Sequence, residues 1–204
     1  MKITLGLDCS DSPEDIATYV KDGADEFFVG FVPSEWYNRY GWEIPLNRRT
    51  FGLQSQLIQY QELERIIAVI HSQDKKIVIA FNAHQYSDEQ IPLLREIILE
   101  VERLNPDGYI VADLALMIML RKWGIQRPLH LSTGSACFNS QTIRYLSQKI
   151  GTSKSEISVL LCIFILPEGS FDIGNCVSSK SIKGTKRTLA QRLCCSSNRG
   201  QVRN

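Results

Sequence analysis

The chain has 204 residues, of which 44% are hydrophobic and 22% are charged. A chain of this length and composition is expected to be one soluble globular protein with a sizeable core. It has no run of about 20 apolar residues, as a membrane-spanning helix requires, and no secretory signal at its start. We therefore expect a cytoplasmic protein that makes no contact with a membrane. Its six cysteines are then thiols or metal ligands rather than disulfides.

The formal net charge of +1 hides an uneven distribution along the chain. After Asp172 there is no acidic residue but there are seven basic ones: Lys180, Lys183, Lys186, Arg187, Arg192, Arg199 and Arg203. Residues 1–172 therefore carry a net charge of −6. We predict an acidic domain over residues 1–172 and a basic tail over residues 173–204, whose lack of apolar periodicity is typical of disorder.

The apolar periodicity predicts alternating strands and helices. In chain order, these are a strand over residues 3–7, a helix from Pro13, a strand over 25–32, a helix over 57–72, a strand over 76–81, a helix over 88–103, a strand over 109–111, a helix over 114–123, a strand over 129–131 and a helix after Asn139. Ser12 and Asp15 are spaced as a capping box at the first helix, and Gly23 suits its carboxyl end. The helix over 114–123 is almost wholly apolar, which predicts that it is buried or covered.

Residues 33–53 interrupt this alternation and predict a long loop. The segment is rich in aromatic and basic side chains: Trp36, Tyr37, Arg39, Tyr40, Trp42, Arg48 and Arg49. Loops of this length in compact domains are usually functional lids or disordered. Two interpretations have equal weight here: a lid over a site, or aromatic side chains that simply pack the segment onto the domain.

Five consecutive strand–helix units are compatible with a doubly wound sheet or with a (β/α) barrel. The first predicted strand is followed by Asp8-Cys9-Ser10-Asp11, without the glycine-rich turn of a dinucleotide-binding sheet. Polar residues instead recur at strand ends, and a barrel collects such residues around one rim. The sequence therefore favours an α/β fold of the TIM-barrel type. A complete barrel needs about 250 residues, so we expect an incomplete one with an unpaired strand edge, through which the chain could self-associate.

The candidate catalytic residues lie at the ends of the last three predicted strands. They are Asn82, His84, Asp113, His130, Ser132 and Thr133. We expect these side chains to meet at one rim, where His84 and Asp113 could share a proton or bind a metal. Other interpretations remain for His130, because a histidine inside a strand is more often a hydrogen-bonded core residue. Ser132 and Thr133 could be nucleophiles, substrate donors or helix caps.

Several of these landmarks resemble one known family. The segment Gly23-Ala24-Asp25-Glu26-Phe27-Phe28-Val29-Gly30 resembles its second-strand motif. His130-Leu131-Ser132-Thr133, followed by Asn139, resembles its fifth-strand motif, and Asn82 and Asp113 follow the third and fourth strands as in that family. Over roughly residues 1–150, the chain resembles the collagenase-like peptidases of peptidase family U32.

This resemblance implies a barrel-like catalytic domain. Its members were first labelled proteases, and some are similar to proteins required for hydroxylating RNA or quinones, several of them with an iron–sulfur cluster. The family's cysteine signature is degenerate here: Gly174-Asn175-Cys176 matches its last part, Cys162 replaces an acidic residue, and a further cysteine falls near Cys194 or Cys195. The resemblance therefore supports only Cys176 and Cys194 as metal ligands. Since a cluster usually needs four thiolates, we predict that this chain does not stably bind one.

Three functions follow from these observations. The first is an enzyme of the collagenase-like peptidase type, for which hydroxylation of RNA or a quinone is favoured over peptide hydrolysis. The second is an accessory protein that holds RNA through phosphate contacts of the basic tail. The third is an inactive remnant, because the chain is shortened after about residue 150 relative to the family pattern.

Overall fold

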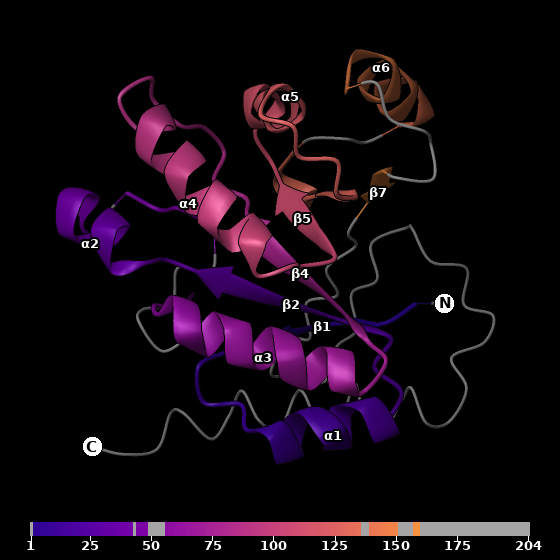
Figure 1. The fold of residues 1–204 in the computed structure, drawn as a ribbon. Coiled ribbons are helices and arrows are strands. Elements are labelled where there is room, and N and C mark those ends of the chain that lie inside the picture. The colour runs from indigo at the N-terminus through magenta and orange to yellow at the C-terminus, as the bar shows by residue number, and fades with distance from the viewer. Residues whose placement is uncertain (1, 43, 49–55, 136–138, 151–156, 160–204) are drawn as a thin grey trace, which may run out of the picture.

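The computed structural model describes residues 2–42, 44–48, 56–135, 139–150 and 157–159 (Figure 1). Strands and helices alternate through these residues, as the sequence predicts. The elements are β1 Thr4–Leu7, α1 Pro13–Lys21, β2 Glu26–Phe31, α2 Ser34–Tyr40, β3 Gln56–Leu57, α3 Tyr60–Ser72, β4 Lys76–Phe81, α4 Ile91–Arg103, β5 Gly108–Val111, α5 Leu114–Lys122, β6 Leu129–Leu131, a 3₁₀ turn Thr133–Ser135, α6 Ser140–Ile150 and β7 Ile157–Val159.

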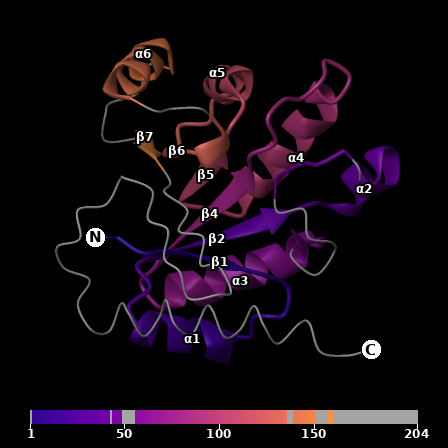
Figure 2. The same ribbon diagram turned by 180° about the vertical axis from the view of Figure 1, so that it is seen from behind.

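The described strands form one parallel sheet in the order β1-β2-β4-β5-β6-β7, with the short β3 beside β2. The strand order never reverses, whereas a doubly wound sheet reverses at a switch point and has helices on both faces. Helices α3 and α4 lie in front of the strands in Figure 1 and behind them in the opposite view of Figure 2. The winding is that of an α/β barrel, as the sequence predicts.

Two contacts between non-adjacent strands show that the sheet is strongly curved. Strands β2 and β6 are three strand spacings apart, which is about 14 Å in a flat sheet. Nevertheless, Nδ1 of His130 on β6 lies 3.9 Å from Oε2 of Glu26 on β2. Beyond the ends of β4 and β6, Nδ2 of Asn82 lies 3.4 Å from Oγ of Ser132. The sheet therefore curls around its helix-free inner face, as in part of a barrel.

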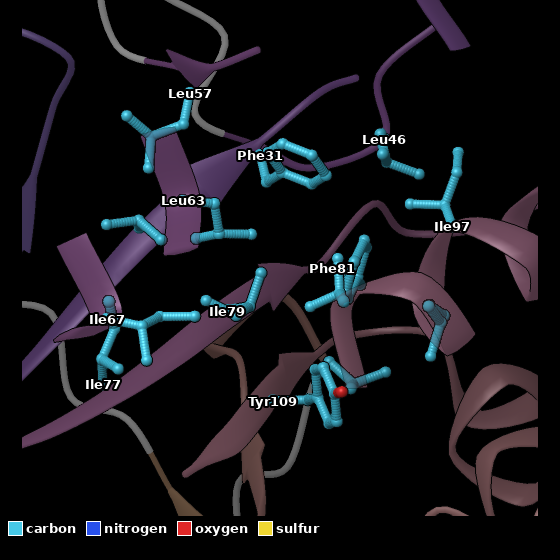
Figure 3. Close-up of a cluster of buried hydrophobic side chains, with 14 of the residues drawn as sticks. Phe31, Leu46, Leu57, Leu63, Ile67, Ile77, Ile79, Phe81, Ile97 and Tyr109 are labelled. Carbon is cyan, nitrogen blue, oxygen red and sulfur yellow. The ribbon is translucent and has the colours of Figure 1, made fainter. Parts of the chain in front are cut away.

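The main core lies between the outer face of the sheet and the helices (Figure 3). Alternate residues of β4 and β5 point into it, among them Ile77, Ile79, Phe81 and Tyr109. They pack against the apolar faces of the helices, for example Leu63 of α3. Full burial of one such side chain contributes roughly 1.5–3 kcal/mol to stability. The residues between them in β4 point to the inner face, where Val78 and Ala80 form a small second cluster with Ile110.

The start of α1 confirms the capping box expected from the sequence. Ser12 Oγ accepts a hydrogen bond from the Asp15 backbone N–H at 3.2 Å, and the Asp15 carboxylate accepts one from the Ser12 N–H at 3.1 Å. Pro13 follows at the first helical position, where its missing N–H leaves no donor unused. Gly23 follows the helix with a φ of 103°, which suits a residue without a Cβ.

The loop predicted over residues 33–53 is wrong in its first part, which forms α2. This helix is held by its aromatic side chains: Trp36 is fully buried, and Tyr40 Oη donates to the Glu89 carbonyl at 3.0 Å. The helix predicted from residue 57 begins only at Tyr60, because Gln56–Leu57 form β3. Strand β3 extends the edge of β2 beyond the residues paired with β1, an interaction between distant segments that local periodicity does not reveal.

Helix α5 is less buried than its apolar sequence predicts. Leu116, Met117 and Leu120 are buried, whereas Leu114 and Ile118 are 44% and 40% exposed. The helix has two apolar sides, and the sheet covers only one of them. Helix α5 is partly exposed because a single layer of helices surrounds the curved sheet.

Within the described residues, β1 and β7 end the sheet on opposite sides and do not pair with each other. The ring of strands is thus open in this part of the chain, as expected, and self-association through these edges stays a prediction. No helix of the described residues is long and apolar enough to cross a membrane. The domain limit predicted at residue 172 and the basic tail lie outside the described residues.

Candidate functional site at the carboxyl-end rim

Asn82 and Ser132 meet at the carboxyl ends of the strands. Asn82 follows β4 and Ser132 follows β6, so the curvature of the sheet brings them together across the end of β5. Asn82 Nδ2 donates to Ser132 Oγ at 3.4 Å, and Asn82 Oδ1 accepts from the backbone N–H of Arg48 at 2.8 Å. These two bonds fix the orientation of the Asn82 amide, with its NH₂ group toward β6.

Residues 44–48 run along this rim and are tied to it at several points. Trp36 Nε1 donates to the Ile44 carbonyl at 3.0 Å, and Tyr86 Oη donates to the Leu46 carbonyl at 2.7 Å. Burial raises the pKa of Tyr86, so its hydroxyl stays protonated and able to donate. Of the two interpretations of this segment, the packed one describes residues 44–48. Packing does not exclude a function, because the segment carries Arg48 to the rim.

A buried pair of side-chain amides joins residues 44–48 to β3. Asn47 Nδ2 donates to Gln56 Oε1 at 2.9 Å, and Gln56 Nε2 donates to Asn47 Oδ1 at 3.0 Å. The pair lies directly over Gly30, where a Cβ would come within 2.3 Å of Gln56 Oε1. Gly30 is therefore the position on β2 that lets a side-chain pair approach the backbone.

His84 and Arg48 converge on the turn after β6. A Cβ at Gly134 would lie 2.4 Å from Arg48 Nη1 and 2.7 Å from His84 Cε1, so both side chains rest against this glycine. Both are exposed residues. We call Arg48, Asn82, His84, Ser132 and Gly134 the rim cluster. All but its glycine offer a side-chain hydrogen-bond donor, and His84 can also accept a proton.

The backbone after β6 positions Ser132. Its N–H donates to the Val111 carbonyl at 2.9 Å, and its carbonyl accepts from Ser135 N at 2.9 Å and Ser135 Oγ at 2.7 Å. Gly134 N donates to Ser132 Oγ at 3.4 Å, so two long hydrogen bonds end on this hydroxyl oxygen. Thr133 belongs to the same 3₁₀ turn, but its side chain is outside what the structure describes.

Asp113 has a structural role at the start of α5. Its carboxylate accepts from the Ala115 N–H at 2.8 Å and caps the helix. Its charge is also close enough to Tyr86 to add to the burial effect that raises the pKa of that tyrosine. Among the described residues, no hydrogen bond or ion pair joins Asp113 to His84, so the expected proton sharing stays a prediction.

His130 lies on the inner face but belongs to a second polar group. Glu26 is buried there and receives contacts from Lys2 Nζ, from Thr4 Oγ1 at 3.1 Å and from His130 Nδ1 at 3.9 Å. Burial lowers the pKa of His130, and the positive charges of Lys2 and Lys76 act in the same direction, whereas Glu26 opposes the shift. The reading of His130 as a core histidine therefore describes its environment well.

The expected metal ligands Cys176 and Cys194 lie outside the described residues. Within the described residues, no group of three His, Cys, Asp or Glu side chains could hold a metal ion. Cys9, after β1, is exposed, and its thiol pKa is raised by partial burial and by the charges of Asp8 and Glu62. A raised pKa disfavours the thiolate that an iron–sulfur cluster requires. The ligand set that the family resemblance implies stays a prediction.

Arg48 and Gly134 are not among the site residues predicted from the sequence. Both carried a signal, since Arg48 is part of the basic segment after β2 and Gly134 lies inside the strand-end motif that contains Ser132. Their importance depends on contacts across the rim between residues far apart in the chain.

Comparison with known proteins agrees with this architecture. A search of curated proteins found no significant match. Among solved structures, the U32 peptidase Mk0906 matches with a TM-score of 0.50 and 17% sequence identity over 73% of this chain. The match covers 56% of the Mk0906 chain, so the present chain spans little more than half of that protein. At this identity the likeness concerns the fold.

The family itself is shown by the sequence profile of Peptidase family U32, which matches residues 11–154. This range contains every residue of the rim cluster and begins just before α1. On this evidence, the chain is a member of Peptidase family U32.

Proposed function

We propose that this protein hydrolyses peptide bonds at the rim cluster. The observation that carries the proposal is the approach of Asn82, from β4, to Ser132, from β6, beside the exposed imidazole of His84. Membership of Peptidase family U32 supports the same class of reaction. The sequence alone favours hydroxylation. We propose hydrolysis instead, because a fixed amide donor and a neighbouring base suit acyl transfer.

Each group has a defined task in this mechanism. A peptide carbonyl oxygen at the rim accepts hydrogen bonds from Asn82 Nδ2 and the Ser132 hydroxyl, which stabilise the negative charge that develops as the carbonyl carbon is attacked. His84 takes a proton from the attacking water as the new C–O bond forms. The C–N bond then breaks and the amine leaves with that proton, so the products are a carboxylic acid and an amine.

Ser132 acts as a donor rather than as the nucleophile in this proposal. Its Oγ accepts hydrogen bonds from Asn82 Nδ2 and Gly134 N. A serine nucleophile needs a base in contact with its hydroxyl, and no described side chain accepts a hydrogen bond from Ser132. A water activated by His84 meets fewer geometric obstacles.

The test is hydrolysis of denatured collagen and of a library of quenched fluorescent peptides by the purified chain. We expect Asn82→Ala and His84→Ala to lower kcat/KM by roughly 100-fold or more, the usual effect of losing a charge-stabilising donor or a general base. Arg95→Ala, an exposed arginine on α4, serves as the control and should retain full activity.

Absence of hydrolysis by a folded wild-type chain would overturn this proposal. It would favour the alternatives from the sequence, which are an enzyme that hydroxylates RNA or a quinone, an RNA-binding accessory protein and an inactive remnant. Unchanged kinetics of the His84→Ala variant would overturn the role of His84 as the base.

A further inference from the structure

We propose that Arg48 and His84 bind the carboxylate of a peptide substrate, and that Gly134 provides the space for this contact. The inference rests on the proposed function, which places a peptide at the rim cluster. It assigns the part of the substrate that is recognised next to the reacting carbonyl.

The side chains of Arg48 and His84 come together beside Gly134. Arg48 Nη1 and His84 Cε1 approach the same point above Gly134, at 2.4 and 2.7 Å from where a Cβ would be. Arg48 comes from the segment after α2 and His84 from the loop after β4, so residues from distant parts of the chain form one group. Because both are exposed, a ligand from solvent can reach them.

The rim cluster has an excess of hydrogen-bond donors. An arginine guanidinium carries five N–H donors and no acceptor, and a planar carboxylate matches its geometry. Within the described residues, neither Arg48 nor His84 forms an ion pair. The nearby acceptor Asn82 Oδ1 already receives the Arg48 backbone N–H. Among the described residues, no carboxylate pairs with this cluster, and a substrate carboxylate would supply that negative charge.

The neighbouring Asn82 amide and Ser132 hydroxyl can bind a second oxygen of the same ligand. Asn82 Nδ2 and Gly134 N both reach Ser132 Oγ at 3.4 Å, near the upper limit of a hydrogen bond. Long bonds of this kind are easily exchanged for shorter ones to a ligand oxygen. A carbonyl bound there and a carboxylate bound at Arg48 would lie on the same substrate, which favours peptides cleaved close to a free carboxyl group.

A substitution at Gly134 tests the inference while Arg48 and His84 stay in place in the sequence. An added methyl group would displace Arg48 Nη1 and His84 Cε1, which are ends of side chains that can move, so Gly134→Ala should fold normally. Gly134 is not among the described glycines with a positive φ, so alanine fits its backbone. The variant therefore changes the geometry of the site and little else.

The experiment uses the ring signal of His84 in an NMR titration. The chain has three histidines, so the Cε1–H signals can be assigned with one substitution each. The ligands are an N-acetylated dipeptide with a free carboxylate, the same dipeptide as its amide, and inorganic phosphate. The proteins are the wild type, Arg48→Ala, Gly134→Ala and the control Arg95→Ala.

We expect the carboxylate dipeptide to shift the His84 signal saturably in the wild type and in Arg95→Ala. Binding should weaken at least 10-fold in Arg48→Ala and in Gly134→Ala, and the amide should bind at least 10-fold more weakly than the carboxylate. Equal binding of amide and carboxylate, or unchanged binding by Arg48→Ala, overturns the inference. Phosphate binding tighter than that of the carboxylate would overturn the assignment to a peptide carboxylate.

The titration needs no turnover, so it separates the two proposals. Carboxylate binding by a chain that hydrolyses no peptide would contradict the proposed reaction and leave this contact standing. Hydrolysis that is equally fast for free and amidated peptides, with a KM unchanged in Arg48→Ala, would contradict the contact and leave the reaction standing.

Discussion

The environment of His130 links the stability of the protein to pH. Burial and the charges of Lys2 and Lys76 lower the pKa of this imidazole in the folded state, although Glu26 acts in the opposite direction. In the unfolded chain the group has its ordinary pKa of 6.5. As the pH falls below this value, the unfolded state takes up a proton more readily than the folded state, and the free energy of unfolding decreases.

We therefore expect the wild-type protein to lose stability between pH 6.5 and 5, and His130→Gln to show a flatter profile. Urea unfolding at several pH values measures this effect. The matched control is His84→Gln, in which an exposed imidazole is removed and the wild-type slope should persist. A His130→Gln profile parallel to that of the wild type would contradict the prediction.

Gly30 offers a second test at the scale of single residues. Its Cβ would approach Gln56 Oε1 to 2.3 Å, and Gln56 is buried in its pair with Asn47. Overpacking of this kind destabilises a protein by roughly 1–3 kcal/mol. Gly30→Ala should therefore unfold at lower urea concentration, and adding Gln56→Ala should recover part of the loss. Gly134→Ala is the comparison, because it meets only movable side-chain ends.

At the scale of elements, the cap of α1 stabilises its first turn. Ser12→Ala removes the hydroxyl that accepts from Asp15 N and should lower stability by about 1 kcal/mol. Ser72→Ala is the control, since its hydroxyl bonds only to a carbonyl of its own helix. Thermal unfolding measures both, and equal melting temperatures for the two variants would show that the cap contributes little.

Local sequence was sufficient for some elements and insufficient for others. The strand over residues 76–81 and the capping box of α1 depend on neighbouring residues, and both appear as predicted. Helix α2 depends on the burial of Trp36, whose ring packs edge-on against that of the distant Tyr86, and β3 depends on pairing with β2. Neither interaction leaves a periodic pattern, so both elements were missed.

The residues of the candidate site also differ in how well the local sequence predicts them. Asn82, His84 and Ser132 could be selected because each follows a predicted strand, and the winding of the sheet places all three at one end. Arg48 could not be ranked above the other arginines of its segment. Its place depends on tertiary contacts of residues 44–48, such as the one between Tyr86 and Leu46.

At the scale of the whole molecule, the uneven charge predicts weak RNA binding by the tail. Residues 173–204 carry seven positive charges and no negative ones. If all seven contact phosphates of single-stranded RNA, the slope of log K against log salt approaches about −5. Filter binding of the full chain tests this against a variant with Lys180, Lys183, Lys186 and Arg187 changed to Gln. Four body substitutions to Gln, at Arg95, Arg103, Lys122 and Arg144, form the control.

We expect binding to weaken steeply with salt and to fall in the tail variant alone. Salt-independent binding, or an equal loss in the control, would contradict the prediction.

The whole chain is also predicted not to hold an iron–sulfur cluster stably. Only Cys176 and Cys194 have support as ligands from the family pattern, and four thiolates are usually required. Anaerobic reconstitution followed by iron and sulfide analysis should give far less than one cluster per chain. Stoichiometric iron that disappears in Cys176→Ala would disprove this expectation.

The attachment of residues 44–48 suggests how substrate preference could change during evolution. Asn82 and Ser132 directly follow strands of the sheet, and in the proposed mechanism they are the groups that act on the reacting bond. Arg48 lies on a connection between β2 and β3, and its side chain can be exchanged while Trp36 and Tyr86 still hold the backbone. Relatives with the same reaction could therefore acquire new substrates by varying this connection alone, and a designer could begin a library there.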